Sequence, residues 1–120
     1  MKTIISGSRT INDFDLLEKV IENCEWPITE VISGDSRGAD KLGEIWARRN
    51  RIPLKKFPAN WNPEGGKFDK AAGIKRNLEM AKYSQCLIAL WDGKSVGTEH
   101  MIRTAKSFGL RIHVEIILEK

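Results

Sequence analysis

The sequence predicts an α/β fold, a Rossmann-like three-layer sandwich in which a five-stranded, mainly parallel sheet carries helices on both faces. The first observation behind this prediction is that five short apolar runs alternate with stretches of helical periodicity. The second is that right-handed crossovers between successive strands leave few topologies other than a parallel sheet, for which we expect the strand order 3-2-1-4-5. The pattern uses all 120 residues, so we expect one domain over residues 1–120.

The first half of the chain contains the signals for three strands and two helices. The strands are short, apolar and bounded by glycine or proline, and we expect them at Lys2–Ser6, Thr29–Ser33 and Leu54–Phe57. Asn12 or Asp13 can cap a helix that runs to about Asn23. Leu42, Ile45 and Trp46 share one face of a second helix, which we expect over Ala39–Arg49.

The second half begins with a segment rich in Pro, Asn and Gly, Pro58–Gly66, which predicts a long loop around Trp61. A helix is expected over Phe68–Tyr83 and a fourth strand over Gln85–Trp91. A turn, a last helix that stops before Gly109, and the fifth strand follow at Asp92–Gly97, Thr98–Phe108 and Arg111–Leu118.

Composition narrows the class of protein. No apolar run approaches the ~20 residues that span a bilayer, and the first residues lack the pattern of a secretory signal, so we expect a cytoplasmic protein that does not enter a membrane. Cys24 and Cys86 stand alone without metal-ligand spacing, which predicts reduced thiols and no metal site. The net charge of +4 favours anionic ligands without choosing among them.

The chemistry is expected in the loops that follow the strands, because parallel α/β sheets bind ligands at the carboxyl ends of their strands. These loops read GSRTIND, SGDSRGAD, FPANWNPEGG and WDGKSVGT in chain order. Glycine lets the backbone approach a ligand, helix N-termini attract phosphate, and arginine binds phosphate oxygens in pairs. The GxGxxG and GxxxxGK[ST] motifs are absent, which disfavours the common NAD-binding and ATPase classes.

Taken together, the motifs resemble the YspA-type, YpsA-related branch of the SLOG superfamily. The resemblance rests on a first-strand GSR, the SGxxRGAD loop, WA on the following helix, FPA-x-W in the long loop, Arg-Asn on the next helix, and WDGxSxGT after the fourth strand. It implies a Rossmann-like domain that binds a nucleotide or a nucleotide-derived ligand, such as an ADP-ribose-like compound.

The resemblance also implies ligand contacts, with Trp61 as a stacking or lid residue. The implied contacts are Gly7, Ser8, Arg9, Ser33, Gly34, Arg37, Gly38, Asp40, Trp61, Arg76, Asn77, Asp92, Gly93, Ser95, Gly97 and Thr98.

Two departures from the family pattern matter for function. The second loop of the family reads SGGARGAD, and this chain has Asp35 where a glycine stands. The phosphoribohydrolase relatives carry a catalytic glutamate in PGGxGTxxE, and Met101 takes its place here, which disfavours hydrolysis by that mechanism.

Several of these residues also have a structural interpretation. Asp40 can bond loop amides near the helix start, Arg76 can belong to a solvated cationic face, and Trp91 can either pack or stack on a base. Trp46 is expected in the core and Trp26 over the sheet edge. The two histidines, His100 and His113, are expected to be packing or surface residues.

Three functions fit the sequence. The first is binding or sensing of a nucleotide-type small molecule. The second is a hydrolase or lyase that cleaves an N-glycosidic or phosphoester bond, with Asp40 or Asp92 as catalytic candidates. The third is binding of single-stranded nucleic acid through Trp61, Arg9 and the lysines. A homo-oligomer is compatible with all three.

Overall fold

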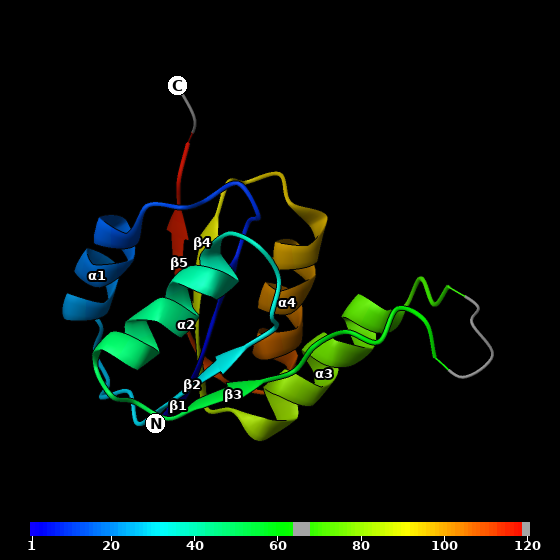
Figure 1. Ribbon diagram of the computed structural model, residues 1–120, viewed down its shortest axis with the longest axis horizontal. Coiled ribbons are helices and arrows are strands. Elements are labelled where there is room, and N and C mark those ends of the chain that lie inside the picture. The colour runs from blue at the N-terminus through cyan, green and yellow to red at the C-terminus, as the bar shows by residue number, and fades with distance from the viewer. Residues whose placement is uncertain (64–67, 119–120) are drawn as a thin grey trace.

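The computed structural model describes residues 1–63 and 68–118, and its helices and strands alternate along the chain (Figure 1). The elements are β1 (Lys2–Gly7), α1 (Phe14–Glu22), β2 (Glu30–Ser33), α2 (Ala39–Arg49), β3 (Leu54–Lys56), α3 (Ala72–Tyr83), β4 (Cys86–Trp91), α4 (Val96–Ser107) and β5 (Arg111–Ile116).

The five strands form one parallel sheet in the order β3-β2-β1-β4-β5, which confirms the predicted fold class and strand order. The central strands β1 and β4 are apolar on both faces, as parallel strands covered by helices must be. Ile4, Ile5, Leu87 and Ile88 are all fully buried.

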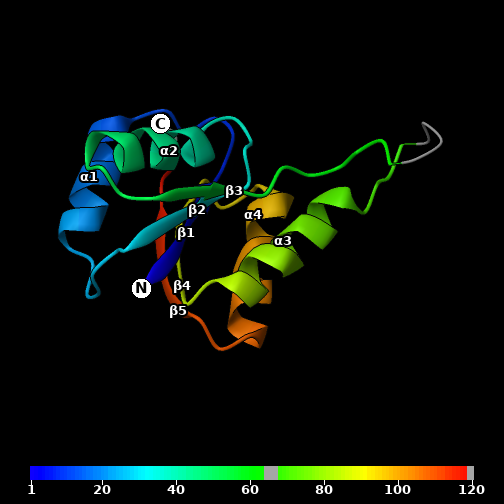
Figure 2. The ribbon, with the colours of Figure 1, turned by 60° about the horizontal axis from the view of Figure 1, so that its bottom comes forward.

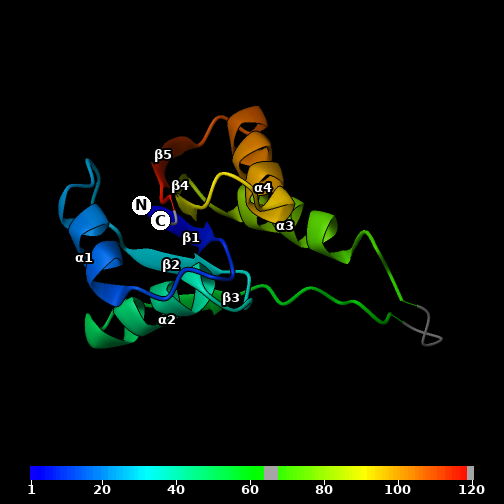
Figure 3. The ribbon, with the colours of Figure 1, turned by 90° about the horizontal axis from the view of Figure 1, so that it is seen from above.

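Successive side chains of each strand point into two different cores, one on each face of the sheet. Ile5 and Ile88 pack with residues of α1 and α2, whereas Ile4 and Leu87 pack with residues of α3 and α4. Figure 3 shows the resulting three layers, with α1 and α2 on one side of the strands and α3 and α4 on the other. Because β1 and β4 are neighbours with helices on opposite faces, the loops that follow them flank a crevice.

The start of α3 differs from the sequence prediction. The periodicity predicts a helix from Phe68, and α3 begins at Ala72. Phe68 instead stacks on Trp61, with ring centroids 5.7 Å apart and planes at 11°, and Asp69 closes a turn by accepting the N–H of Ala71 on its side chain at 2.9 Å. This aromatic contact holds Phe68 outside the helix. The end of the expected loop, at Gly66, lies outside the described residues. Figure 2 shows the chain after β3 leading away from the sheet before it returns at α3.

Two other boundaries differ by two residues, and the remaining ones by at most one. The last helix begins at Val96, two residues before the expected Thr98, because Ser95 caps it and accepts the N–H of Thr98 on Oγ. The strand β5 ends at Ile116, not Leu118, because its partner β4 ends at Trp91, the residue paired with Ile116.

The tryptophans are mostly structural. Trp26, predicted over the sheet edge, is instead 8% exposed in the core under α1, where its Nε1 donates to Thr3 Oγ1 of the central strand at 3.0 Å. Trp46 packs partly buried against the same core, as predicted. Trp91 packs in the opposite core and donates its Nε1 to the carbonyl of Ser95 at 3.0 Å, so it holds the fourth loop.

Candidate functional site

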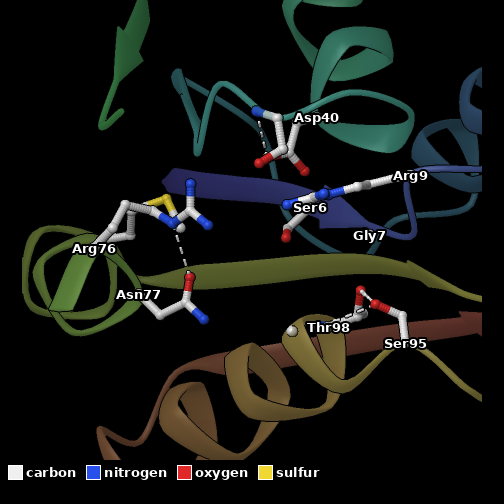
Figure 4. Close-up of a pocket in the computed structure, with 11 residues that line it drawn as sticks. Ser6, Gly7, Arg9, Asp40, Arg76, Asn77, Ser95 and Thr98 are labelled. Carbon is white, nitrogen blue, oxygen red and sulfur yellow. Dashed lines mark hydrogen bonds between the residues drawn. The ribbon is translucent and has the colours of Figure 1, made fainter. Parts of the chain in front are cut away.

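A cavity of about 70 Å³ lies at the carboxyl end of β1, between α2, α3 and α4 (Figure 4). Its volume corresponds to roughly two water molecules at about 30 Å³ each, so it suits a small group and not a whole ligand. Polar side chains dominate its wall, which is lined by Ser6, Gly7, Arg9, Ser36, Asp40, Arg76, Asn77, Met80, Ser95, Gly97 and Thr98.

The first loop places Arg9 at this cavity. A Cβ at Gly7 would lie 2.1 Å from the carbonyl oxygen of Leu90, so only glycine permits the close approach of β1 to β4 here. Ser8 is buried, and its Oγ accepts the N–H of Asp92 at 3.0 Å, which ties the first loop to the fourth. Arg9 is exposed, and its guanidinium extends over the cavity (Figure 4).

The second loop packs against the first through Gly38. This residue has φ of 77°, and a Cβ there would lie 2.4 Å from the carbonyl oxygen of Ser8. Asp35, which replaces a family glycine, adopts φ of 62°, a conformation that glycine, Asn and Asp tolerate best. Its carboxylate pairs with Lys41 and with Lys56, which lower its pKa, Lys41 the more strongly. Asp35 therefore adopts a backbone conformation typical of the glycine it replaces, and it does not line the cavity.

A buried carboxylate that the sequence prediction missed supports this loop. Glu44 is 1% exposed and accepts a hydrogen bond from Ser33 Oγ at 2.7 Å. Its other oxygen lies 3.5 Å from Lys41 Nζ and 3.4 Å from Lys56 Nζ. The sequence spacing could have predicted this position, because Glu44 follows Asp40 by four residues and therefore lies on the same face of α2.

Asp40 is a nearly buried carboxylate in the cavity wall, 4% exposed. Its Oδ2 accepts the N–H of Ser36 at 3.3 Å. Burial raises the pKa of Asp40 to about 6, because the charged form loses hydration, and the nearby Glu44 adds to the rise. Hydrogen bonds from the amides of Ser36 and Gly7 and the charge of Arg76 oppose it. Asp40 can therefore exchange a proton near neutral pH.

Arg76 enters the cavity from α3. Its Nη1 donates to the carbonyl of Gly34, and its Nε donates to Asn77 Oδ1 at 3.1 Å. A Cβ at Gly34 would meet Arg76 Nη1 at 2.8 Å and Asp40 Oδ2 at 2.9 Å, so both charged groups flank this glycine. Burial lowers the pKa of Arg76 and the charge of Arg9 does the same, while Asp40 raises it. The two guanidinium groups are therefore close enough to repel each other when no anion lies between them.

Hydrogen bonds continue from Arg76 to α4. Asn77 is 6% exposed, and its Nδ2 lies 3.0 Å from His100 Nδ1. The sequence interpretation of His100 as a plain packing or surface residue missed this contact, because the two residues lie on adjacent helices and 23 positions apart.

The fourth loop presents the start of α4 to the cavity. Asp92 Oδ1 accepts the amides of Lys94 and Ser95, each at 2.8 Å, and these bonds lower the pKa of Asp92. Its carboxylate therefore organises the turn and lies outside the cavity wall. A Cβ at Gly97 would meet no described atom within 4 Å, so the first turn of α4 is open toward the cavity.

A second cavity of about 230 Å³ adjoins the first and shares Arg9, Arg76, Asn77 and Gly97 with it. Its remaining wall contains Trp61, Lys70, Gly73, Ile74, Val96 and His100. Together the two cavities approach the lower end of the roughly 300–1,000 Å³ typical of small-molecule sites.

The structure thus divides the sequence-predicted contacts. Those that line the first cavity are Gly7, Arg9, Asp40, Arg76, Asn77, Ser95, Gly97 and Thr98. Trp61 lines the second cavity. Those that shape or brace the loops instead are Ser8, Ser33, Gly34, Gly38, Asp92 and Gly93. Arg37 is exposed on the second loop and lines neither cavity.

Three wall residues of the first cavity were absent from the sequence prediction. Ser6 ends the buried part of β1 immediately before the glycine, so its position was readable from the strand pattern. Met80 follows Arg76 by four residues on the same face of α3. Ser36 faces the cavity because its amide bonds Asp40, a contact that no local sequence signal predicts.

Within residues 1–63 and 68–118, no helix is both long and apolar enough to cross a bilayer. The same residues contain no group of three or more His, Cys, Asp or Glu side chains placed to hold a metal ion.

Comparison with known proteins identifies the family. The model of the YspA, cpYpsA-related SLOG family (YAcAr) matches residues 1–63. The "Gene 61 protein" of Mycobacterium phage D29 is 30% identical over 121 aligned residues, which cover 92% of this chain and 93% of the phage protein. No solved structure matches the chain significantly. The matched half contains the GSR and SGxxRGAD loops that form one side of the cavity, and the chain belongs to the YspA, cpYpsA-related SLOG family.

Proposed function

We propose that the protein binds a phosphorylated, nucleotide-derived small molecule and that the phosphate occupies the 70 Å³ cavity at the end of β1. The observation that carries this proposal is the convergence of two guanidinium groups, those of Arg9 and Arg76, on one small cavity that also receives the start of α4 (Figure 4). Membership in a SLOG family supports a nucleotide-type ligand.

The three groups supply complementary contacts for a phosphate. Arginine donates paired, charge-assisted hydrogen bonds to phosphate oxygens. The N-terminus of α4 adds the favourable end of its helix dipole. Ser95 caps only the amide of Thr98 there, and the amide of Gly97 has no partner among the described residues. That amide is therefore available to a phosphate oxygen.

A second function, cleavage of the bound ligand, is favoured by one observation. Asp40 has a pKa raised by burial to about 6 and lines the cavity, which are the properties of a general acid or base near neutral pH. By contrast, Met101 at the place of the relatives' catalytic glutamate is 1% exposed in the core. Of the two carboxylates considered as catalytic candidates, Asp40 and Asp92, only Asp40 lines this cavity.

Calorimetric titration with phosphate, ribose 5-phosphate, AMP and ADP-ribose tests the binding proposal. Arg9→Ala should weaken each ligand roughly 10- to 100-fold, because a charged hydrogen bond contributes about 1.5–3 kcal/mol. Arg9 is exposed, and its guanidinium has no hydrogen-bond partner in the described part of the chain, so this variant should fold normally. Arg103→Ala is the matched control, since Arg103 pairs with Glu99 on an exposed face of α4.

Equal affinity of wild type and Arg9→Ala for all four ligands would refute the proposed phosphate site. A single-stranded oligonucleotide titrated at two salt concentrations separates this proposal from nucleic-acid binding, whose affinity falls steeply with salt. Chromatography of each ligand after incubation with wild type and Asp40→Asn shows whether it is cleaved.

A further inference from the structure

We infer that the second cavity binds the aromatic heterocycle of the same ligand, with Trp61 as its aromatic wall and His100 as its hydrogen-bond donor. This inference rests on the proposed function, because the two cavities share Arg9, Arg76, Asn77 and Gly97 and so adjoin at the phosphate. A ligand held by its phosphate in the first cavity would extend into the second.

The apolar wall of the second cavity is unusually exposed. Val96 is 80% exposed and Ile74 is 48% exposed, and both line the cavity with Trp61. Exposed apolar side chains that gather at a concave site mark a binding surface. An aromatic ring seated there would cover them.

Trp61 is held in place before any ligand binds. Phe68 stacks on its indole at 5.7 Å, and a Cβ at Gly73 would lie 3.3 Å from the indole edge. The glycine of α3 thus makes room for the tryptophan, and the stack fixes its plane. A wall that is already ordered loses little conformational entropy when a ring binds against it.

A chain of hydrogen bonds fixes the proton of His100. A guanidinium can only donate, so Arg76 Nε obliges Asn77 to turn its oxygen toward the arginine and its NH₂ toward α4. Asn77 Nδ2 lies 3.0 Å from His100 Nδ1, which must therefore accept. With Nδ1 accepting, the ring proton of His100 resides on Nε2.

His100 therefore offers an N–H donor beside the apolar wall, in a cavity that also contains three cations, Arg9, Lys70 and Arg76. The ligand class that matches these groups is a phosphorylated aromatic heterocycle with a hydrogen-bond acceptor on its ring edge, as in a nucleoside monophosphate. A lipid tail would leave the N–H of His100 without an acceptor, which costs about 1–3 kcal/mol.

Calorimetry with ribose 5-phosphate, AMP, IMP, CMP and UMP tests this inference. At least one nucleotide should bind about tenfold or more tightly than ribose 5-phosphate, because stacking on an aromatic side chain contributes that much per base. Trp61→Ala should abolish this advantage and leave ribose 5-phosphate affinity unchanged. Trp61→Phe is the matched control and should retain most of the advantage.

A second variant tests the proton of His100. Asn77→Asp replaces a donor with an acceptor, so the proton of His100 moves to Nδ1 and Nε2 becomes an acceptor. All phosphates should bind more weakly beside the new charge, but the ratio of AMP to IMP affinity should also change, because the donors and acceptors at ring positions 1 and 6 of AMP are exchanged in IMP. A merely structural Asn77 would leave that ratio unchanged.

The outcomes separate this inference from the proposed function. If ribose 5-phosphate binds in an Arg9-dependent manner and no nucleotide binds more tightly, the phosphate site stands and the ring site is wrong. If a nucleotide still binds more tightly than ribose 5-phosphate in Trp61→Ala, the proposed binding of the heterocycle in the second cavity is also wrong. If neither ribose 5-phosphate nor any nucleotide binds, both proposals fail.

Discussion

Replacing Asp40 with asparagine should stabilise the protein at neutral and alkaline pH and change the pH dependence of its stability. Burial raises the pKa of Asp40 in the folded protein above its unfolded value, so between these two values the folded protein holds the proton more tightly. Stability associated with this group is therefore greatest below about pH 4, falls as the pH rises toward 6, and stays low above that. An asparagine side chain at this position cannot ionise and avoids this loss.

The size of the effect follows from the shift. A change from 3.8 to about 6 is roughly two pKa units, and each unit corresponds to about 1.36 kcal/mol, so the ionised carboxylate costs about 3 kcal/mol above pH 6. Asparagine keeps only one good acceptor for the amides of Ser36 and Gly7, and a lost hydrogen bond costs about 1 kcal/mol. The net gain expected at pH 8 is therefore about 2 kcal/mol.

Urea denaturation of wild type and Asp40→Asn between pH 4 and pH 8 measures this gain. The difference in unfolding free energy should rise from pH 4 to about pH 6 and then level off, because groups that do not interact with Asp40 cancel in the comparison. Asp92→Asn serves as the opposite control. Backbone amides lower the pKa of Asp92, so its ionised form stabilises the fold above its ordinary pKa and this contribution disappears as the pH falls. A flat difference for Asp40→Asn, or one that falls with rising pH, would refute the reasoning.

Three glycine and capping positions give further predictions. Gly97→Ala should stabilise α4 by roughly 0.5–1 kcal/mol in urea and yet weaken phosphate binding by calorimetry, because its methyl group meets only open space at the cavity; unchanged affinity would place the ligand elsewhere. Gly38→Ala should cost at least about 1–3 kcal/mol in the same denaturation assay, because of the positive φ and the contact with Ser8. Ser95→Ala removes the cap of α4 and should cost about 1 kcal/mol; no loss would contradict the capping role.

The fold was predictable because its signals are local. Apolar runs bounded by glycine and proline located the strands, and the crossover rule ordered them. The start of α3 was not predictable, because the stack of Phe68 on Trp61 depends on two segments meeting across the long loop. Sequence periodicity within the helix contains no information about that contact.

The types of residue that form the site could be predicted from the sequence, but the directions in which their side chains point could not. Two loops carry arginines, and the sequence does not show that Arg9 faces the cavity while Arg37 does not. The second loop has positive φ at both Asp35 and Gly38, on either side of Arg37, and the sequence does not show where such a loop directs its arginine. The contact between Asn77 and His100 joins two helices, so only the tertiary structure reveals it.

The energetics of the free protein also favour an anion in the first cavity. Two guanidinium groups repel each other there, and an ionised Asp40 lowers stability at neutral pH. A phosphate would relieve the first cost by lying between Arg9 and Arg76. It would also raise the pKa of Asp40 further, because like charges disfavour ionisation, so binding should take up a proton.

Anion affinity should consequently increase as the pH falls from 8 toward 6. Sulfate, which does not titrate in this range, is the suitable probe. Sulfate affinity should lose this dependence in Asp40→Asn, and a dependence that survives the substitution would assign the proton to another group.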